Sequence, residues 1–153
     1  MGIIVGLDVG RRRIGVAASD ELGLTAQPVK VLTRVAREKD LDAVAQLCRE
    51  LKAEQVVVGM PYRLDGTMGP QAEMVAAFVR RLQERLDIPV ITWDERLSTA
   101  AARQVLLEAD ASRRRRRQVI DKMAAAVILQ SFLDHRRLGS QDSTPGSEAP
   151  QGC

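Results

Sequence analysis

Four acidic residues in this 153-residue chain stand at positions where acids are unusual. Asp8 interrupts the apolar run 3–10, which is typical of a strand buried on both faces, where an unpaired carboxylate is costly. Asp94 and Glu95 directly follow another apolar run, and Asp121 lies among small apolar residues of a helical segment. Carboxylates that converge repel each other unless a cation joins them, and hard oxygen ligands without His or Cys favour Mg²⁺ or Mn²⁺. The acids therefore predict a site for a divalent metal ion.

Each acid also has a structural explanation. Asp8 can brace the turn that follows it, and Asp121 can balance the dipole of the helix near whose N-terminus it lies. Strand alternation puts Asp94 and Glu95 on opposite faces, so spacing alone leaves open which of them points into a site. Small residues follow Asp121 at helical spacing, which favours a carboxylate directed at a sheet.

The elements that must position these acids follow the order β-β-β-α-β-α-β-α-α. A meander of three strands and two right-handed crossover units predict an α/β fold, with helices on the faces of a mixed sheet. Sites in such sheets form beyond the carboxyl ends of the parallel strands, which brings Asp8, the loop 61–69 and residues 94–95 to one edge. The expected strands cover 3–10, 14–19, 29–32, 55–60 and 89–93, and the expected helices cover 41–51, 70–82, 98–107 and 117–138.

Two runs of arginine suggest a polyanionic partner. Five consecutive arginines stand just before the helix that carries Asp121, and they are Arg113, Arg114, Arg115, Arg116 and Arg117. The macrodipole disfavours positive charge at a helix N-terminus, so a run against that preference favours contacts to phosphates, although a solvated run is the alternative. The second run, Arg11, Arg12 and Arg13, can extend the same surface. We expect both runs to bind nucleic acid without reading bases.

Composition limits the class of protein. Residues 1–138 carry all 23 Lys and Arg against 18 Asp and Glu, a net charge of +5, and we expect them to form one domain. Residues 139–153 lack apolar periodicity and are expected to be a disordered tail. Only 3% of the residues are aromatic, which argues against a platform that stacks single-stranded bases. No apolar run suits a membrane span, and two distant cysteines suit a reducing cytoplasm.

Four stretches, in order along the chain, resemble the RuvX/YqgF family, whose members are similar to Holliday-junction resolvases and have a ribonuclease-H-like fold. One such match would be weak, but four in sequence are specific. The stretches are Gly6–Gly10 with Arg13–Ala17, Val58–Pro61 with Asp65–Thr67, Asp94–Thr99, and Asp121–Ala125.

The resemblance implies a five-stranded mixed sheet in the order 3-2-1-4-5 and a metal-dependent endonuclease that cleaves structured nucleic acid and processes the 5′ end of the 16S rRNA precursor. It places the catalytic, metal-binding acids at Asp8, Glu95 and Asp121, with Asp94 in reserve. Mg²⁺ or Mn²⁺ would activate a water and steady the leaving oxygen. Arg96 would stabilise charge on the phosphate, or else form an ion pair with Asp94 or Glu95.

Other functions fit parts of the same pattern. A Holliday-junction resolvase acting on DNA and a catalytically silent RNA- or ribosome-binding module both suit the basic body. An ATPase of the actin and sugar-kinase type shares the Asp-x-Gly turn but needs two lobes, and 153 residues supply one. The partners expected are precursor rRNA or branched DNA, with the ribosome as a further candidate and no membrane. The sequence allows a monomer or a homodimer.

Overall fold

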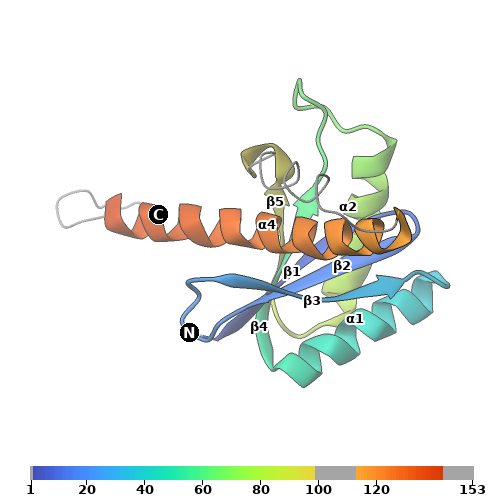
Figure 1. Ribbon diagram of the computed structural model, residues 1–153, viewed down its shortest axis with the longest axis horizontal. Coiled ribbons are helices and arrows are strands. Elements are labelled where there is room, and N and C mark those ends of the chain that lie inside the picture. The colour runs from blue at the N-terminus through green and yellow to red at the C-terminus, as the bar shows by residue number, and fades with distance from the viewer. Residues whose placement is uncertain (1, 99–112, 143–153) are drawn as a thin grey trace.

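The computed structural model describes residues 2–98 and 113–142, and the side chains of residues 2–98 and 123–138. A five-stranded sheet in the order β3-β2-β1-β4-β5 forms the centre of the molecule (Figure 1). This mixed sheet with flanking helices confirms the predicted fold class and strand order. Its strands are β1 (Ile3–Val9), β2 (Arg13–Ser19), β3 (Ala26–Thr33), β4 (Ala53–Met60) and β5 (Val90–Asp94).

β1 is the central strand, with β2 and β3 on one side and β4 and β5 on the other. It runs antiparallel to β2, as the predicted hairpin requires, and parallel to β4, which in turn is parallel to β5. A strand with sheet on both sides and helices on both faces has no solvated face, and β1 is correspondingly apolar, with Leu7 fully buried.

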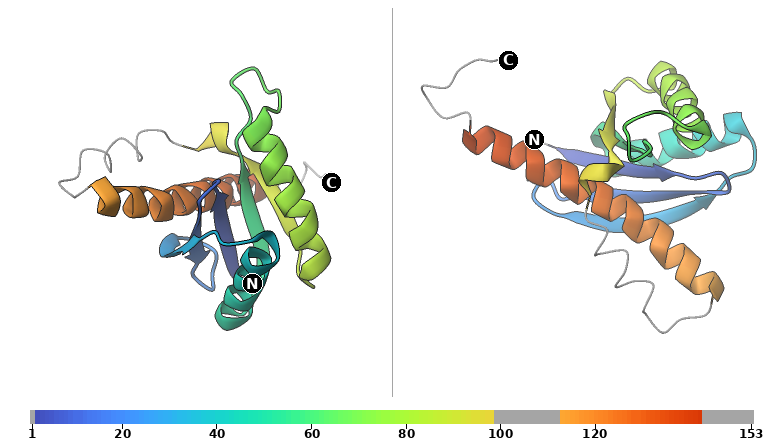
Figure 2. Two further views of the ribbon diagram at one scale, coloured as in Figure 1. Left: turned by 90° about the vertical axis from the view of Figure 1, so that its right-hand side faces the viewer. Right: turned by 90° about the horizontal axis from the view of Figure 1, so that it is seen from above.

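Helices cover both faces of the sheet, which gives three layers (Figure 2). The helices α1 (Arg37–Leu51) and α2 (Pro70–Arg85) lie on one face, and α4 (Arg113–Asp142) lies on the other. Pro70 opens α2 at a position where a proline is tolerated, as predicted. No helix in these described ranges is long and apolar enough to cross a membrane.

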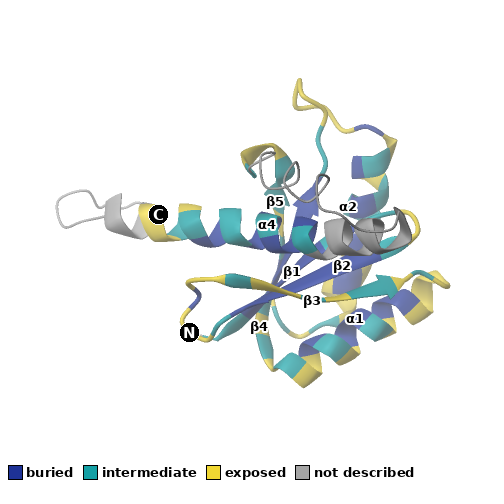
Figure 3. Ribbon diagram, viewed as in Figure 1, coloured by how far each residue is buried: buried dark blue, intermediate teal, exposed yellow. Residues whose placement is uncertain are grey.

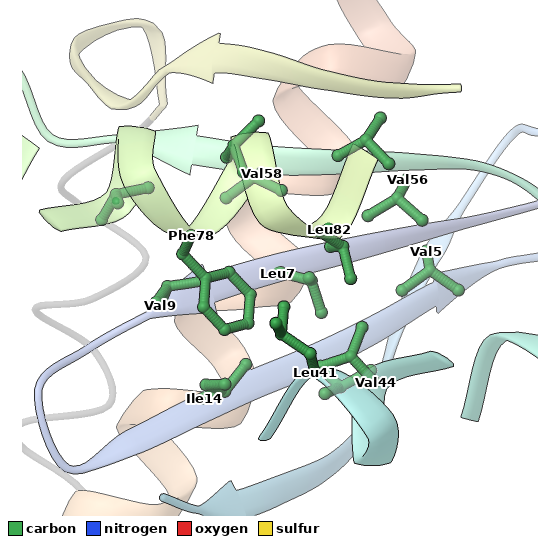
Figure 4. Close-up of a cluster of buried hydrophobic side chains, with 14 of the residues drawn as sticks. Val5, Leu7, Val9, Ile14, Leu41, Val44, Val56, Val58, Phe78 and Leu82 are labelled. Atoms are coloured by element: carbon green, nitrogen blue, oxygen red, sulfur yellow. The ribbon is translucent and has the colours of Figure 1, made fainter. Parts of the chain in front are cut away.

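Two apolar clusters hold the layers together. Under α1 and α2, alternate residues of β1 and β4 pack against helix residues such as Leu41, Phe78 and Leu82 (Figure 4). On the opposite face Ala125 and Leu129 of α4 pack against Ile4, Ala17 and Val57. α4 lies very close to the sheet there, because a Cβ at Gly6 would lie 2.7 Å from Cβ of Leu129.

Several elements extend beyond the expected ends: α1 begins at Arg37 instead of 41, α2 ends at Arg85 instead of 82, and β4 begins at Ala53 instead of 55. β3 reaches Ala26 and Thr33, because its pairing with β2 continues to Ser19 and Arg13. α4 begins four residues before the expected start at about Arg117, since arginine is a good helix former. The residues that this correction adds to the helix are Arg113, Arg114, Arg115 and Arg116.

The C-terminal part of the chain differs from the expectation as well. α4 continues through residues 139–142, which were expected to belong to the disordered tail. The rest of that tail lies outside the described residues. So does the predicted short helix at 98–107, apart from Ser98.

Candidate functional site

Asp8 lies near the carboxyl end of β1, on the face of the sheet that α4 covers. Its neighbours Leu7 and Val9 both point into the cluster under α1 and α2, so alternation along the strand directs Asp8 to the other face. Asp8 pairs with Gly15 of β2 and is only partly buried. The pairing with β2 fixes the position of the Asp8 backbone in the sheet.

Glu95 reaches the same face from a different element. Leu7 pairs with Val58, so Gly59, the next residue of β4, lies beside Asp8. A Cβ placed on Gly59 would lie 2.6 Å from Cδ1 of Ile128 in α4 and 3.0 Å from Oε2 of Glu95. The Glu95 carboxylate therefore lies over Gly59, on the α4 face, where glycine leaves room for it. The structure thus brings Asp8 and Glu95 to one face of adjacent strands.

Asp94 has a different environment from Glu95. It pairs with Met60, whose side chain belongs to the cluster under α1 and α2. Both oxygens of the Asp94 carboxylate accept hydrogen bonds from Arg96, with Nη2 2.6 Å from Oδ2. The side-chain hydrogen bond from Arg96 lowers the pKa of Asp94 below its ordinary value. Asp94 also accepts the backbone N–H of Arg96, and so caps the 3₁₀ turn η1 (Glu95–Leu97), which carries Glu95.

Arg96 ties this turn to the loop 61–69. Its guanidinium donates to the carbonyl oxygen of Leu64 at 3.3 Å and lies over the ring of Tyr62, 5.6 Å from the ring centre. The predicted turn at Asp65 and Gly66 is present, with Gly66 at φ +88°. Of the two alternatives for Arg96, the ion pair with Asp94 is the one observed, and a contact from Arg96 to a phosphate remains a prediction.

Asp121 lies on α4, and its side chain is outside the described set. It precedes Ala125 by four residues and Ile128 by seven, the spacing of one helix face. Ala125 and Ile128 both contact the sheet, at Gly6 and Gly59. Among the side chains of residues 2–98 and 123–138, no three acidic, His or Cys residues gather closely enough to hold a metal ion. That Asp121 joins Asp8 and Glu95 in a metal site stays a prediction.

The arginines of the shorter run lie at the same edge of the sheet as Asp8. Arg11 and Arg12 are exposed in the turn between β1 and β2. Arg13 begins β2 on the α4 face, two residues before Gly15, the partner of Asp8.

The longer run of arginines forms the first turns of α4, the helix that also carries Asp121. Its members are Arg113, Arg114, Arg115, Arg116 and Arg117, and their side chains lie outside the described set. Contact between either run and nucleic acid stays a prediction.

The buried ion pair that fixes the turn between β1 and β2 was not predicted from the sequence. Nε of Arg34 lies 3.0 Å from Oδ2 of Asp40, and only 7% of the Asp40 side chain is exposed. Arg34 also donates to the carbonyl oxygen of Gly10 at 2.9 Å and lies over the ring of Phe78. Its partners are up to 44 positions away in sequence, so the sequence does not reveal these contacts. The one local signal is helical spacing, which places Asp40, directly before Leu41, toward the buried side of the helix.

Comparisons with known proteins agree with this geometry. Residues 2–135 match the model of the RuvX family, described as Holliday junction resolvase. A protein of Symbiobacterium thermophilum is 58% identical over 133 residues, which cover 87% of this chain and 92% of that protein. One of Desulforamulus reducens is 54% identical over 131 residues, 86% of this chain and 96% of that protein. Both are named "Putative pre-16S rRNA nuclease".

Solved structures share the fold at low sequence identity. RuvC of Thermus thermophilus, in complex with a Holliday junction, aligns with a TM-score of 0.62 at 15% identity, covering 92% of this chain and 98% of that one. The fowlpox virus Holliday junction resolvase aligns with a TM-score of 0.52, also at 15% identity, covering 87% and 99%. The fold is therefore the expected ribonuclease-H-like one, and the family match over residues 2–135 shows that the chain belongs to the RuvX family.

Proposed function

We propose that this protein is a metal-dependent endonuclease that hydrolyses phosphodiester bonds in structured nucleic acid, and that it processes the 5′ end of the 16S rRNA precursor. The observation that carries the proposal is the Glu95 carboxylate over Gly59, on the sheet face to which Asp8 also points. The names of relatives about half identical over most of their length favour precursor rRNA as the substrate. That role would place the protein in the cytoplasm, with the ribosome as a partner.

Asp8, Glu95 and Asp121 would hold Mg²⁺ or Mn²⁺. The donor set fits these ions because it is made of carboxylate oxygens. Among the described residues the possible soft ligands lie elsewhere: Cys48 is buried in the cluster under α1 and α2, and His135 lies against the ring of Trp93. When bound, such ions lower the pKa of a coordinated water and neutralise charge at the scissile phosphate.

The chain itself supplies position and charge. The strand ladders fix Asp8, and the cap by Asp94 fixes the turn that presents Glu95. Ser98 adds a hydrogen bond from Oγ to the carbonyl oxygen of Glu95 at 2.6 Å. Phosphates on either side of the acids would bind the two arginine runs, 11–13 and 113–117.

Cleavage of a defined panel tests the proposal. Pure protein with Mn²⁺ should cleave pre-16S RNA in preference to single strands and four-way DNA junctions. Glu95→Gln and Asp121→Asn should abolish cleavage while the fold, followed by circular dichroism, and RNA affinity stay nearly intact.

Asp94→Asn is the matched control, because asparagine caps a helix as well as aspartate does and should leave most of the activity. Preferred cleavage of junctions would make DNA the substrate. Binding without cleavage by the wild type, with either metal, would make the protein a silent RNA-binding module and refute the proposal.

A further inference from the structure

A second basic site lies on the opposite face of the sheet from the acids. A depression beside the turn between β1 and β2 is lined by three arginines, Arg11, Arg34 and Arg37, and by one acid, Asp40. Val35, Ala36 and Met74 complete its lining. Three guanidinium groups against one carboxylate leave a surplus of positive charge in a hollow, which is the electrostatic arrangement that attracts an anion.

Arg34 is held in place with one end of its guanidinium group unused. Nε donates to Asp40, and Nη1 donates to the carbonyl oxygen of Gly10 and lies 3.5 Å from Sδ of Met74. In the described part of the chain, Nη2 has no hydrogen-bond acceptor. With 17% of its side chain exposed, Arg34 forms a fixed floor to the depression, so a ligand would bind it at little further cost in side-chain entropy.

The nearest acids of α1 are directed elsewhere. Glu38 and Asp42 both form ion pairs with Arg85 of α2, on the part of the surface away from the depression. They therefore do not neutralise Arg37, which is exposed and forms no ion pair among the residues described. The positive charge at the depression is left for an external partner.

We propose that this depression binds a backbone phosphate of the nucleic acid, outside the cleaved bond. The inference rests on the proposed action on nucleic acid. The depression and Asp8 lie on opposite faces of the sheet but at the same edge, since Arg34 bonds to Gly10, two residues after Asp8. A nucleic-acid strand that crosses this edge of the sheet would contact the acids on one face and the three arginines on the other. These contacts would hold the nucleic acid in register without any base being read.

Salt-dependent binding tests the site. The variant Arg37→Gln removes one exposed charge from the depression and leaves the Arg34–Asp40 pair intact. The control, Arg49→Gln, removes the same charge from the far end of α1, about 18 Å from Arg37 along the helix. Affinity for a labelled pre-16S RNA is measured in EDTA, where no cleavage occurs, over a range of salt concentrations.

Loss of one phosphate contact should lower the slope of log K against log salt by about 0.7 to 0.9 in the first variant and much less in the control. Affinity at low salt should fall roughly tenfold, as for a lost charge-assisted hydrogen bond. With Mn²⁺, the KM for RNA should rise while kcat is kept. Equal slopes in the two variants would overturn the inference. The inference would also be overturned if inorganic phosphate shifts the amide NMR signals of residues 10–13 while the salt slope for RNA binding is unchanged. The site would then bind only a small anion.

Failure of the proposed function has a different signature. If the wild type cleaves no substrate but the slope still falls only in the first variant, the phosphate site stands and the nuclease activity does not. If the wild type cleaves RNA and the slopes are equal, the nuclease stands and this site does not.

Discussion

Replacing Gly59 with alanine should separate the packing of the candidate site from its chemistry. The added Cβ would lie 2.6 Å from Cδ1 of the fully buried Ile128, roughly 1 Å closer than a normal carbon–carbon contact. Such overpacking costs about 1 to 3 kcal/mol, and the reduced entropy of the unfolded chain returns about 0.4 to 1 kcal/mol. We expect a net loss of about 1 to 2 kcal/mol in the free energy of unfolding, or roughly 2 to 8 °C in Tm.

The same Cβ would also lie 3.0 Å from Cγ and Oε2 of Glu95, so the carboxylate must move by a few tenths of an ångström. Cleavage is sensitive to such displacement, and we expect the rate to fall roughly tenfold or more.

The variant Ile128→Val supplies the control, because valine lacks the Cδ1 atom that meets the new methyl group. Alone it should cost about 0.5 to 1.5 kcal/mol. Combined with Gly59→Ala it should restore stability, with a coupling energy of about 0.5 to 3 kcal/mol, but not activity, because Glu95 stays displaced. The wild type, the two single variants and the double variant are compared. Their thermal unfolding gives the coupling energy, and their initial cleavage rates give the effect on activity. Additive losses of stability, or activity that returns together with Tm, would refute the reasoning.

Four further outcomes are expected. Replacing Arg113 to Arg117 with alanine should weaken binding of unrelated RNA sequences by similar factors and flatten the salt slope by about 0.7 to 0.9 per phosphate lost, whereas an unchanged slope would mean a solvated run. Without metal, Asp8→Asn should melt higher than the wild type, because it removes one of the three carboxylates proposed to share the site. It should also lack most of the gain of about 2.7 kcal/mol that the wild type draws from a hundredfold excess of Mn²⁺ over Kd. A variant that melts lower and keeps the full gain would make Asp8 a structural brace. Because the pKa of Asp94 is lowered by Arg96, the stability that this pair contributes should be lost as the pH falls through the folded pKa, so urea unfolding of Asp94→Asn should show a flatter acid limb. Burial raises the pKa of Cys48 to about 11, so in a Cys153→Ser background its thiol should react with iodoacetamide at pH 8 far more slowly when folded than in urea, and rapid labelling of the folded protein would contradict its burial.

Most of the fold could be predicted because its signals are local. The apolar runs around Leu7 and Val57 mark strands buried on both faces, and the turn at Gly66 and the proline at position 70 mark element ends. The choice between Asp94 and Glu95 could not be made, because alternation ends where the strand does. Glu95 is positioned by the 3₁₀ turn that follows, and it reaches the α4 face over Gly59.

The contacts of Arg34 could not be predicted for a related reason. Its side chain joins Gly10, Asp40 and Phe78, which come together only in the folded sheet and helices. No spacing in the sequence relates them. The start of α4 at Arg113 has a different origin, because it follows the helix propensity of arginine and has no apolar periodicity to mark it.

The position of α4 after all five strands in the chain has a consequence for folding during synthesis. The helix packs on β1, β2 and β3, and Oε1 of Gln130 accepts the backbone N–H of Ala26, 104 positions earlier (Figure 3 shows the buried strands beneath the helix). Until α4 leaves the ribosome, one apolar face of the sheet lacks its cover, and Asp8 lacks the helix that carries Asp121. Domains fold as units, N-terminal parts first, at about 5 to 20 residues per second. Completion of the core and of the proposed site would thus be the same event, which follows the emergence of α4 from the ribosome.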